Sequence, residues 1–191
     1  PNDDQPYLMR NVQVPVGEGL ATIDMTAELH RGIWIKGRVT NKATGKPVQA
    51  VRLHYLPYRT NPFAQATPEF DENGNVDGDQ TRYQTNENGE YRLVGLPGPA
   101  VVGAESFAFP FRYGVGFDAL NVPTERDAAW QTFFRIPVFP TAKWPNAVLP
   151  IDPPKDAESI TLDFQLDPGN SIEVRVVDES DMLVVGAELR G

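Results

Sequence analysis

Apolar and polar residues alternate along several short stretches of the chain, which is the pattern of β-strands that bury one face. The alternating stretches are residues 23–29, 33–39 and 51–55, and further strands are expected at 90–94 and from 100 to 105. We expect the polar residues of 51–55 to face water. The Asn-Glu-Asn-Gly sequence at 86–89 is a turn signal, because Asn-Gly readily adopts positive φ. It predicts a hairpin between residues 82–85 and 90–94.

Two long connections interrupt this series of strands, at residues 57–80 and 113–154. The whole chain carries 18 prolines and 16 glycines, a composition that disfavours long helices and favours turns. One short helix is predicted in the second connection, where Thr124 follows Pro123 and begins a capping-box-like sequence. Long loops on a rigid sheet are common binding sites, so we expect any specific ligand to bind there.

The end of the chain resembles its beginning. The matched segments are 23–32 with 160–169, 35–39 with 172–176 and, after a gap of one residue, 48–53 with 184–189. Ile160 stands 137 positions after Ile23, and this offset holds up to the gap. Repetition at a fixed spacing is typical of repeated structural units. Two alternatives stay open: the tail opens a second copy of the fold, or it adds strands to the first.

These patterns divide the chain into three parts. They are an N-terminal lead-in or linker at 1–20, a β-sandwich at 21–168 with insertions at 57–80 and 113–154, and a segment at 169–191 that opens a second repeat or extends the first. The sequence begins with Pro1 and not with Met. We therefore expect it to be a piece of a longer protein.

Composition excludes several classes of function. The chain has 191 residues and a net charge of −9, and an acidic chain without a basic stripe is not expected to bind nucleic acid. No apolar run approaches the roughly 20 residues that span a bilayer, so we expect no membrane span in this chain. Cysteine is absent, which rules out disulfides, thiolate metal sites and cysteine nucleophiles.

Four sequence blocks, at 37–40, 44–51, 85–93 and 95–98, occur in an order that resembles the carboxypeptidase regulatory-like domain family. The resemblance implies an all-β, transthyretin-like (prealbumin-like, Ig-like) sandwich of about seven strands. It also implies a non-catalytic module attached to peptidases, outer-membrane receptors or large secreted proteins. The Gly-Leu-Pro-Gly-Pro sequence at 95–99, together with the long insertions, is similar to modules of large planctomycete-type bacterial proteins. An extracytoplasmic location (secreted, periplasmic or cell surface) is the corresponding expectation.

An acidic run at residues 71–79 is a candidate calcium site, since Ca²⁺ prefers hard oxygen ligands on a loop that contains glycine. The candidate ligands are Asn73, Asn75, Asp77 and Asp79. Their spacing follows the first half of an EF-hand loop, but its first position is Asn73 where Asp is usual, and its twelfth is Gln84 where Glu is required. The alternative is an ordinary solvated acidic turn, and no other cofactor is expected.

The chain is not expected to be an enzyme. Its only histidines, His30 and His54, fall on different predicted strands, and we expect both to be exposed residues at strand ends. The sequence contains no nucleophile elbow, phosphate-binding loop or His-Glu-x-x-His motif.

Aromatic residues are dense in the second insertion, where they either fill core or pin the loop to the sandwich. The sharper hypothesis is that Trp130 or Trp144 is exposed as a stacking platform for sugar rings or as an anchor for a partner. The leading prediction is a non-catalytic structural or interaction module whose partners are neighbouring domains or another protein. The alternatives are a carbohydrate-binding module and an accessory domain of a peptidase or other enzyme.

Overall fold

The structure is a computed structural model that describes residues 5–8, 24–67, 83–107, 111–120, 145–170, 175–184 and 186. Its elements are β1 (Ile33–Asn41), β2 (Arg52–Pro57), α1 (Pro62–Gln65), β3 (Glu90–Gly95), β4 (Ala100–Glu105), η2 (Phe117–Leu120), β5 (Ala147–Ile151), β6 (Ser159–Thr161) and β7 (Phe164–Leu166). Strands dominate and each helical element has only four residues. The prediction of an all-β fold is confirmed.

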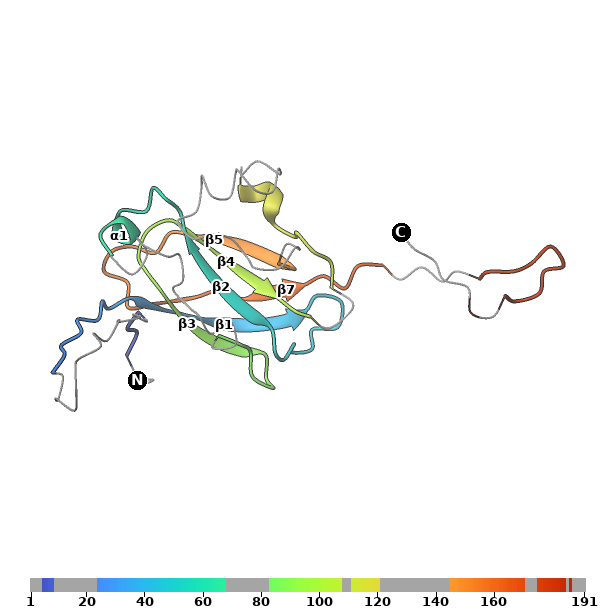
Figure 1. Ribbon diagram of the computed structural model, residues 1–191, viewed down its shortest axis with the longest axis horizontal. Coiled ribbons are helices and arrows are strands. Elements are labelled where there is room, and N and C mark those ends of the chain that lie inside the picture. Colours follow the sequence, from blue (N-terminus) through green and yellow to red (C-terminus); the bar gives the residue numbers. More distant parts are fainter. Residues whose placement is uncertain are drawn as a thin grey trace, which may run out of the picture.

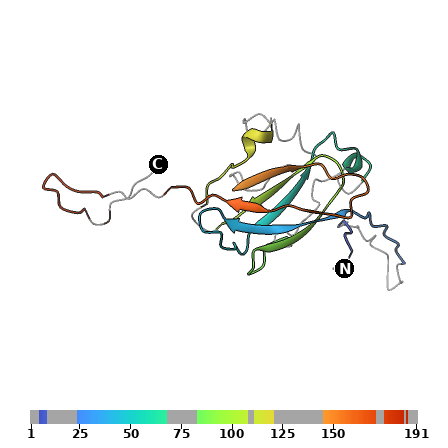
Figure 2. The same ribbon diagram turned by 180° about the vertical axis from the view of Figure 1, so that it is seen from behind.

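The strands form two sheets (Figures 1 and 2). In the first, β1 is central: β3 pairs with it antiparallel on one side, and β6 and β7 pair with it in parallel on the other. In the second, β4 is central and pairs antiparallel with β2 and β5. Val39 of β1 pairs with Phe164 of β7, so these two neighbouring strands are more than 120 residues apart in the sequence.

One apolar core fills the space between the sheets. Alternate residues of β1 point into it, since Ile35 and Val39 are fully buried whereas Lys36 is exposed. The core also takes residues from every other strand except β6, namely Leu53, Tyr91, Leu93, Val102, Ala104, Ala147, Phe164 and Leu166. Because both sheets contribute, burial of this core stabilises the two-sheet arrangement as one unit.

Gly37 lets the chain pass from β6 to β7 while both strands stay beside β1. A Cβ atom at this position would overlap the carbonyl oxygen of Leu162, which lies between the two short strands. Leu162 is held there by its own N–H, which donates to the Lys36 carbonyl oxygen at 2.8 Å, and by the Tyr91 hydroxyl, which donates to its carbonyl oxygen at 2.6 Å. A glycine in a strand commonly marks such a close backbone approach.

The predicted strand at 23–29 is wrong over the described residues. Residues 24–30 form no strand, and Met25 and Leu29 are 46% and 50% exposed. Alternation predicts a strand only where a neighbouring strand supplies hydrogen bonds and a buried face, and residues 24–30 pair with no strand of the described chain. The contact nearby is made by residues 5–8, where Tyr7 bridges Arg31 and Leu8 is buried against Val94 and Leu96.

The predicted hairpin around 86–89 is partly wrong. The turn forms, with Gly89 at φ 73° and the Asn86 side chain accepting the Glu90 N–H at 2.9 Å. Its two arms, however, join different partners: β3 pairs with β1, whereas residues 83–85 hydrogen-bond to residues 51–53. The turn thus carries the chain from the second sheet to the first.

Two further expectations need correction. The second predicted insertion, 113–154, contains β5, a strand of the second sheet that carries Pro150 near its end. Pro150 is tolerated because β5 pairs only with β4 among the described strands and is an edge strand. The polar face of β2 does not face water either: every residue of β4 beside it is buried, and the His54 side chain is only 16% exposed.

Candidate functional site

The residues predicted to bind ligands lie outside the described part of the chain. They are Trp130 and Trp144 for a sugar or partner, and Asn73, Asn75, Asp77 and Asp79 for calcium. The described residues do show how the acidic connection is attached. It leaves after Thr67, whose hydroxyl donates to the Phe63 carbonyl oxygen at 2.8 Å, and it returns at Tyr83, whose carbonyl oxygen accepts from the Leu53 N–H at 2.8 Å. Both ends are therefore fixed to the scaffold.

A buried acid–base pair connects β2 to β4. Nε2 of His54 lies 3.2 Å from Oε2 of Glu105, and Glu105 is 4% exposed. The expectation that His54 is an exposed residue at a strand end is wrong, because its side chain is 16% exposed and contacts this buried carboxylate diagonally across the sheet. His30 lies outside the strands, before β1 of the first sheet. A carboxylate in contact with an imidazole can share a proton with it and can fix the orientation of the ring.

A second polar centre is formed by Asn146, the residue immediately before β5, which contacts Ser106, the residue after Glu105. The Asn146 side chain is buried, and its Oδ1 accepts from the Ser106 N–H at 2.6 Å. Its Nδ2 donates to the carbonyl oxygens of Phe111 and Arg112 at 3.2 and 3.1 Å. One amide therefore joins three backbone groups, and it connects the end of β4 to the segment before η2 and to β5.

Glu105 and Asn146 were not predicted from the sequence. Glu105 ends an otherwise uncharged run at 100–104, and a lone charge at the end of a buried strand is a usable signal, because such charges are rarely buried without a partner. Asn146 follows Pro145, and Pro-Asn is typical of turns, so the sequence carried no sign that this side chain is buried.

The outer face of β1 and β3 carries a charged and aromatic surface. The Arg92 guanidinium lies over the Trp34 ring, 4.2 Å from its centroid, and Lys36 and Arg38 are exposed on the same side. Nε of Arg38 donates to the Asn88 carbonyl oxygen at 2.8 Å. β3 pairs only with β1 among the described strands, and a strand edge without a partner can accept a further strand.

A hairpin in the C-terminal region presents exposed apolar side chains. Val177 and Leu183 form an antiparallel bridge, and the hairpin stands away from both sheets (Figure 1). Its exposed apolar residues and their exposed fractions are Val177 37%, Met182 66%, Leu183 63% and Val184 45%. Apolar side chains gathered in this way on one short element indicate an interaction surface.

Within the described ranges, no group of three or more histidine, cysteine, aspartate or glutamate side chains is placed to hold a metal ion. No helix in those same ranges is long and apolar enough to cross a bilayer. The comparisons assign no family: no protein-family model and no curated protein matches this chain.

Proposed function

We propose that the chain is a non-catalytic structural or interaction module of a larger extracytoplasmic bacterial protein, built on a transthyretin-like sandwich of the carboxypeptidase regulatory-like kind. One observation carries the proposal. Several of the buried polar side chains form their hydrogen bonds with the backbone of the sandwich itself, whereas a group of exposed apolar side chains, Val177, Met182, Leu183 and Val184, lies on a hairpin outside the sandwich.

Asn61, Asn146 and Thr85 show how the polar groups are used. Asn61 is fully buried, accepts the N–H groups of Phe63 and Ala64, and donates to the carbonyl oxygens of Pro97 and Pro99. The Thr85 hydroxyl accepts from the Val51 N–H at 3.0 Å and donates to the Val48 carbonyl oxygen at 2.7 Å. Buried side chains that bond to backbone groups in this way stabilise loops on a sheet, as we expect in a structural module.

The proposal is tested by an immunoblot of fractionated source cells, with antibodies against this chain. We expect a band well above the 21.2 kDa of the chain, in the secreted, periplasmic or surface fraction. A band at the mass of the chain alone in the cytoplasmic fraction would contradict the proposal.

The non-catalytic part is tested by His54→Ala in the native polypeptide. If the pair with Glu105 is structural, any activity of that polypeptide changes only in proportion to its folded fraction, as measured by circular dichroism. Loss of activity in a variant that stays folded would assign a catalytic role to His54.

Carbohydrate binding is the competing function, and it depends on Trp130 and Trp144. A glycan panel probed with the chain and with Trp130→Ala and Trp144→Ala separates the two. If the chain binds a sugar and either substitution abolishes that binding, the result supports a carbohydrate-binding function. If no sugar binds, or if both variants bind unchanged, that alternative is excluded.

A further inference from the structure

The hairpin in the C-terminal region repeats one bridge and three backbone hydrogen bonds of a hairpin of the sandwich. In the sandwich this hairpin is the end of β1 and the turn after it, where Thr40 bridges Pro47; in the tail Val177 bridges Leu183. The matched backbone bonds, donor first, are Asn41 to Lys46 (2.8 Å) with Asp178 to Met182 (2.9 Å), Val48 to Val39 (2.9 Å) with Val184 to Val176 (3.0 Å), and Gly45 to Asn41 (2.8 Å) with Asp181 to Asp178 (3.0 Å). All of them follow from one alignment in which Thr44 has no counterpart.

The backbone dihedrals agree with the same alignment. Gly45 has φ 67° and its counterpart Asp181 has φ 60°, although positive φ is unusual for a residue with a side chain. Ala50 has φ 57° and its counterpart Gly186 has φ 84°. Ala50 and Gly186 lie beyond the turn, so the agreement is not a property of the turn alone.

In the sandwich, other elements cover this hairpin. Val39 is fully buried, and its N–H donates to the Gly89 carbonyl oxygen at 2.8 Å. The Val48 carbonyl oxygen accepts from the Thr85 hydroxyl at 2.7 Å. In the tail, Val184, the counterpart of Val48, is 45% exposed, so the repeated hairpin lacks the covering that residues 85–90 give the first one.

Residues 24–29 resemble the last strands of the sandwich in sequence, but they are exposed where those strands are buried. By the offset of 137 positions, Leu29 corresponds to Leu166 of β7, and Met25 to Leu162. Leu166 is fully buried beside β1, whereas Leu29 is 50% exposed. The resemblance extends upstream in the sequence, where Asn-Val-Gln-Val-Pro-Val at 11–16 is similar to Asn-Ala-Val-Leu-Pro-Ile at 146–151, which is Asn146 followed by β5.

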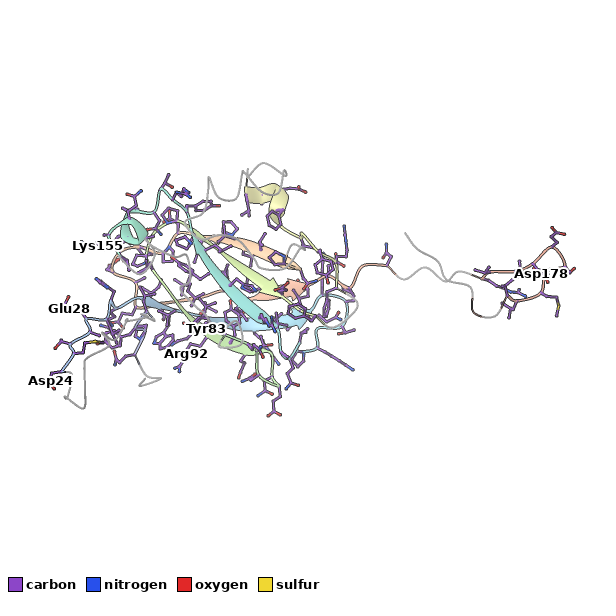
Figure 3. The ribbon with its side chains drawn as sticks, viewed as in Figure 1. Asp24, Glu28, Tyr83, Arg92, Lys155 and Asp178 are labelled. Atoms are coloured by element: carbon purple, nitrogen blue, oxygen red, sulfur yellow. The ribbon has the colours of Figure 1, made fainter. Side chains whose placement is uncertain are left out.

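The two flanking segments lie at opposite ends of the sandwich. Figure 3 places Asp24 and Glu28 at one end and Asp178 beyond the other. Copies joined through these segments would follow one another in a row.

We infer that the chain holds one complete unit, residues 33–169, together with closing strands of a preceding copy and the opening hairpin of a following copy. The partner of each exposed flank is therefore a second copy of this fold in the same polypeptide. Residues 24–29 pair with the β1 counterpart of the preceding unit, and residues 175–184 receive the counterparts of β3 and β7 of the following unit. This inference rests on the proposed function, since it makes the module part of a tandem array.

Hydrogen exchange tests the inference on the native polypeptide that contains this chain, with the 191-residue chain as reference. We expect the amides of Val176, Ala27 and Leu29 to exchange at least about 100-fold more slowly in the native polypeptide, because strand pairing with the neighbouring copies protects them. Equal exchange rates at these amides in the two polypeptides would overturn the inference.

A matched pair of substitutions gives a second readout. In the 191-residue chain, Leu166→Asp buries a charge and is expected to prevent folding, whereas Leu29→Asp leaves the melting temperature unchanged. In the native polypeptide, Leu29→Asp is expected to lower the melting temperature of a unit by about 5 °C or more. If it has no effect there, residues 24–29 do not pair with a preceding copy, and the inference fails.

The outcomes separate this inference from the proposed function. If the native polypeptide is longer than this chain but leaves the flanking amides unprotected, the tandem array is wrong and the module proposal stands. If the native polypeptide is no longer than this chain, both fall.

Discussion

Asn146 provides the most direct test of how this scaffold is held together. The side chain is 1% exposed and makes three hydrogen bonds to backbone groups of Ser106, Phe111 and Arg112. Asn146→Ala removes all three and leaves the backbone groups without this partner. At about 1 kcal/mol for each bond, the expected loss in the free energy of unfolding is about 3 kcal/mol.

Urea denaturation of the full chain measures this loss. With an m-value of about 2 kcal/mol per molar urea, the midpoint is expected to fall by about 1.5 M at unchanged m. Asn170→Ala is the matched control, because Asn170 is exposed and the substitution should move the midpoint by less than about 0.3 M. A loss below about 0.5 kcal/mol for Asn146→Ala would refute the structural role given to this amide.

Asn146→Asp sharpens the same test. The new carboxylate oxygen replaces Nδ2 and faces the carbonyl oxygens of Phe111 and Arg112, so at neutral pH the variant should be about 1 to 2 kcal/mol less stable than Asn146→Ala. Protonation restores a donor, so the Asp variant should recover relative to the Ala variant as the pH falls from 7 to 3. A difference between the two variants that does not change with pH would mean that Nδ2 does not donate to these carbonyls.

Two further predictions concern the junction between β6 and β7. Gly37→Ala should lower the free energy of unfolding by about 2 kcal/mol or more, because its Cβ would overlap the Leu162 carbonyl oxygen. The control is Gly45→Asn, at an open site, which should lower it by less than about 1 kcal/mol. Urea denaturation midpoints compare the two variants. Burial and the nearby Asp163 carboxylate raise the pKa of Tyr91 above its usual 10. The folded state therefore favours the neutral phenol, so the stabilisation contributed by Tyr91 should be intact below pH 10 and fall by about 1.4 kcal/mol per pH unit above it. Burial raises the pKa of Tyr55 as well, so Tyr91→Phe should reduce the total slope by about this amount without abolishing it.

The sequence was a good guide where a strand pairs with a neighbour in the same sandwich. Alternation over 33–39 and the apolar run at 100–105 became β1 and β4, the central strands of the two sheets. The sequence was a poor guide to which strands pair with one another. The Asn-Gly turn at 88–89 was predicted with the correct geometry, but its two arms join different sheets. Local patterns encode which face of a strand is buried, and they carry little information about pairing between distant segments.

The structure does not describe the residues that were predicted as binding sites. The candidate ligands were chosen from the two long loops, since loops on a rigid sheet often bind ligands, and those residues lie outside the described ranges. The structure brings together Glu105 at the end of β4 with His54 inside β2, and Asn146, just before β5, with three backbone groups. Their proximity depends on the register of β2, β4 and β5, which no local motif specifies.

The failed strand prediction at 23–29 and the inferred array have a common physical basis. A sequence specifies a fold when its local pattern agrees with its surroundings, and a conflict between the two calls for an explanation. Residues 24–29 keep the alternation of β6 and β7 but expose Met25 and Leu29, and residues 176–184 keep the hydrogen bonds of the first hairpin but expose Val184. Each conflict disappears if a neighbouring copy supplies the missing half: a β1 for the first segment, and a β3 and β7 for the second. The same strand pattern then accounts for the folded unit and for both of its exposed flanks.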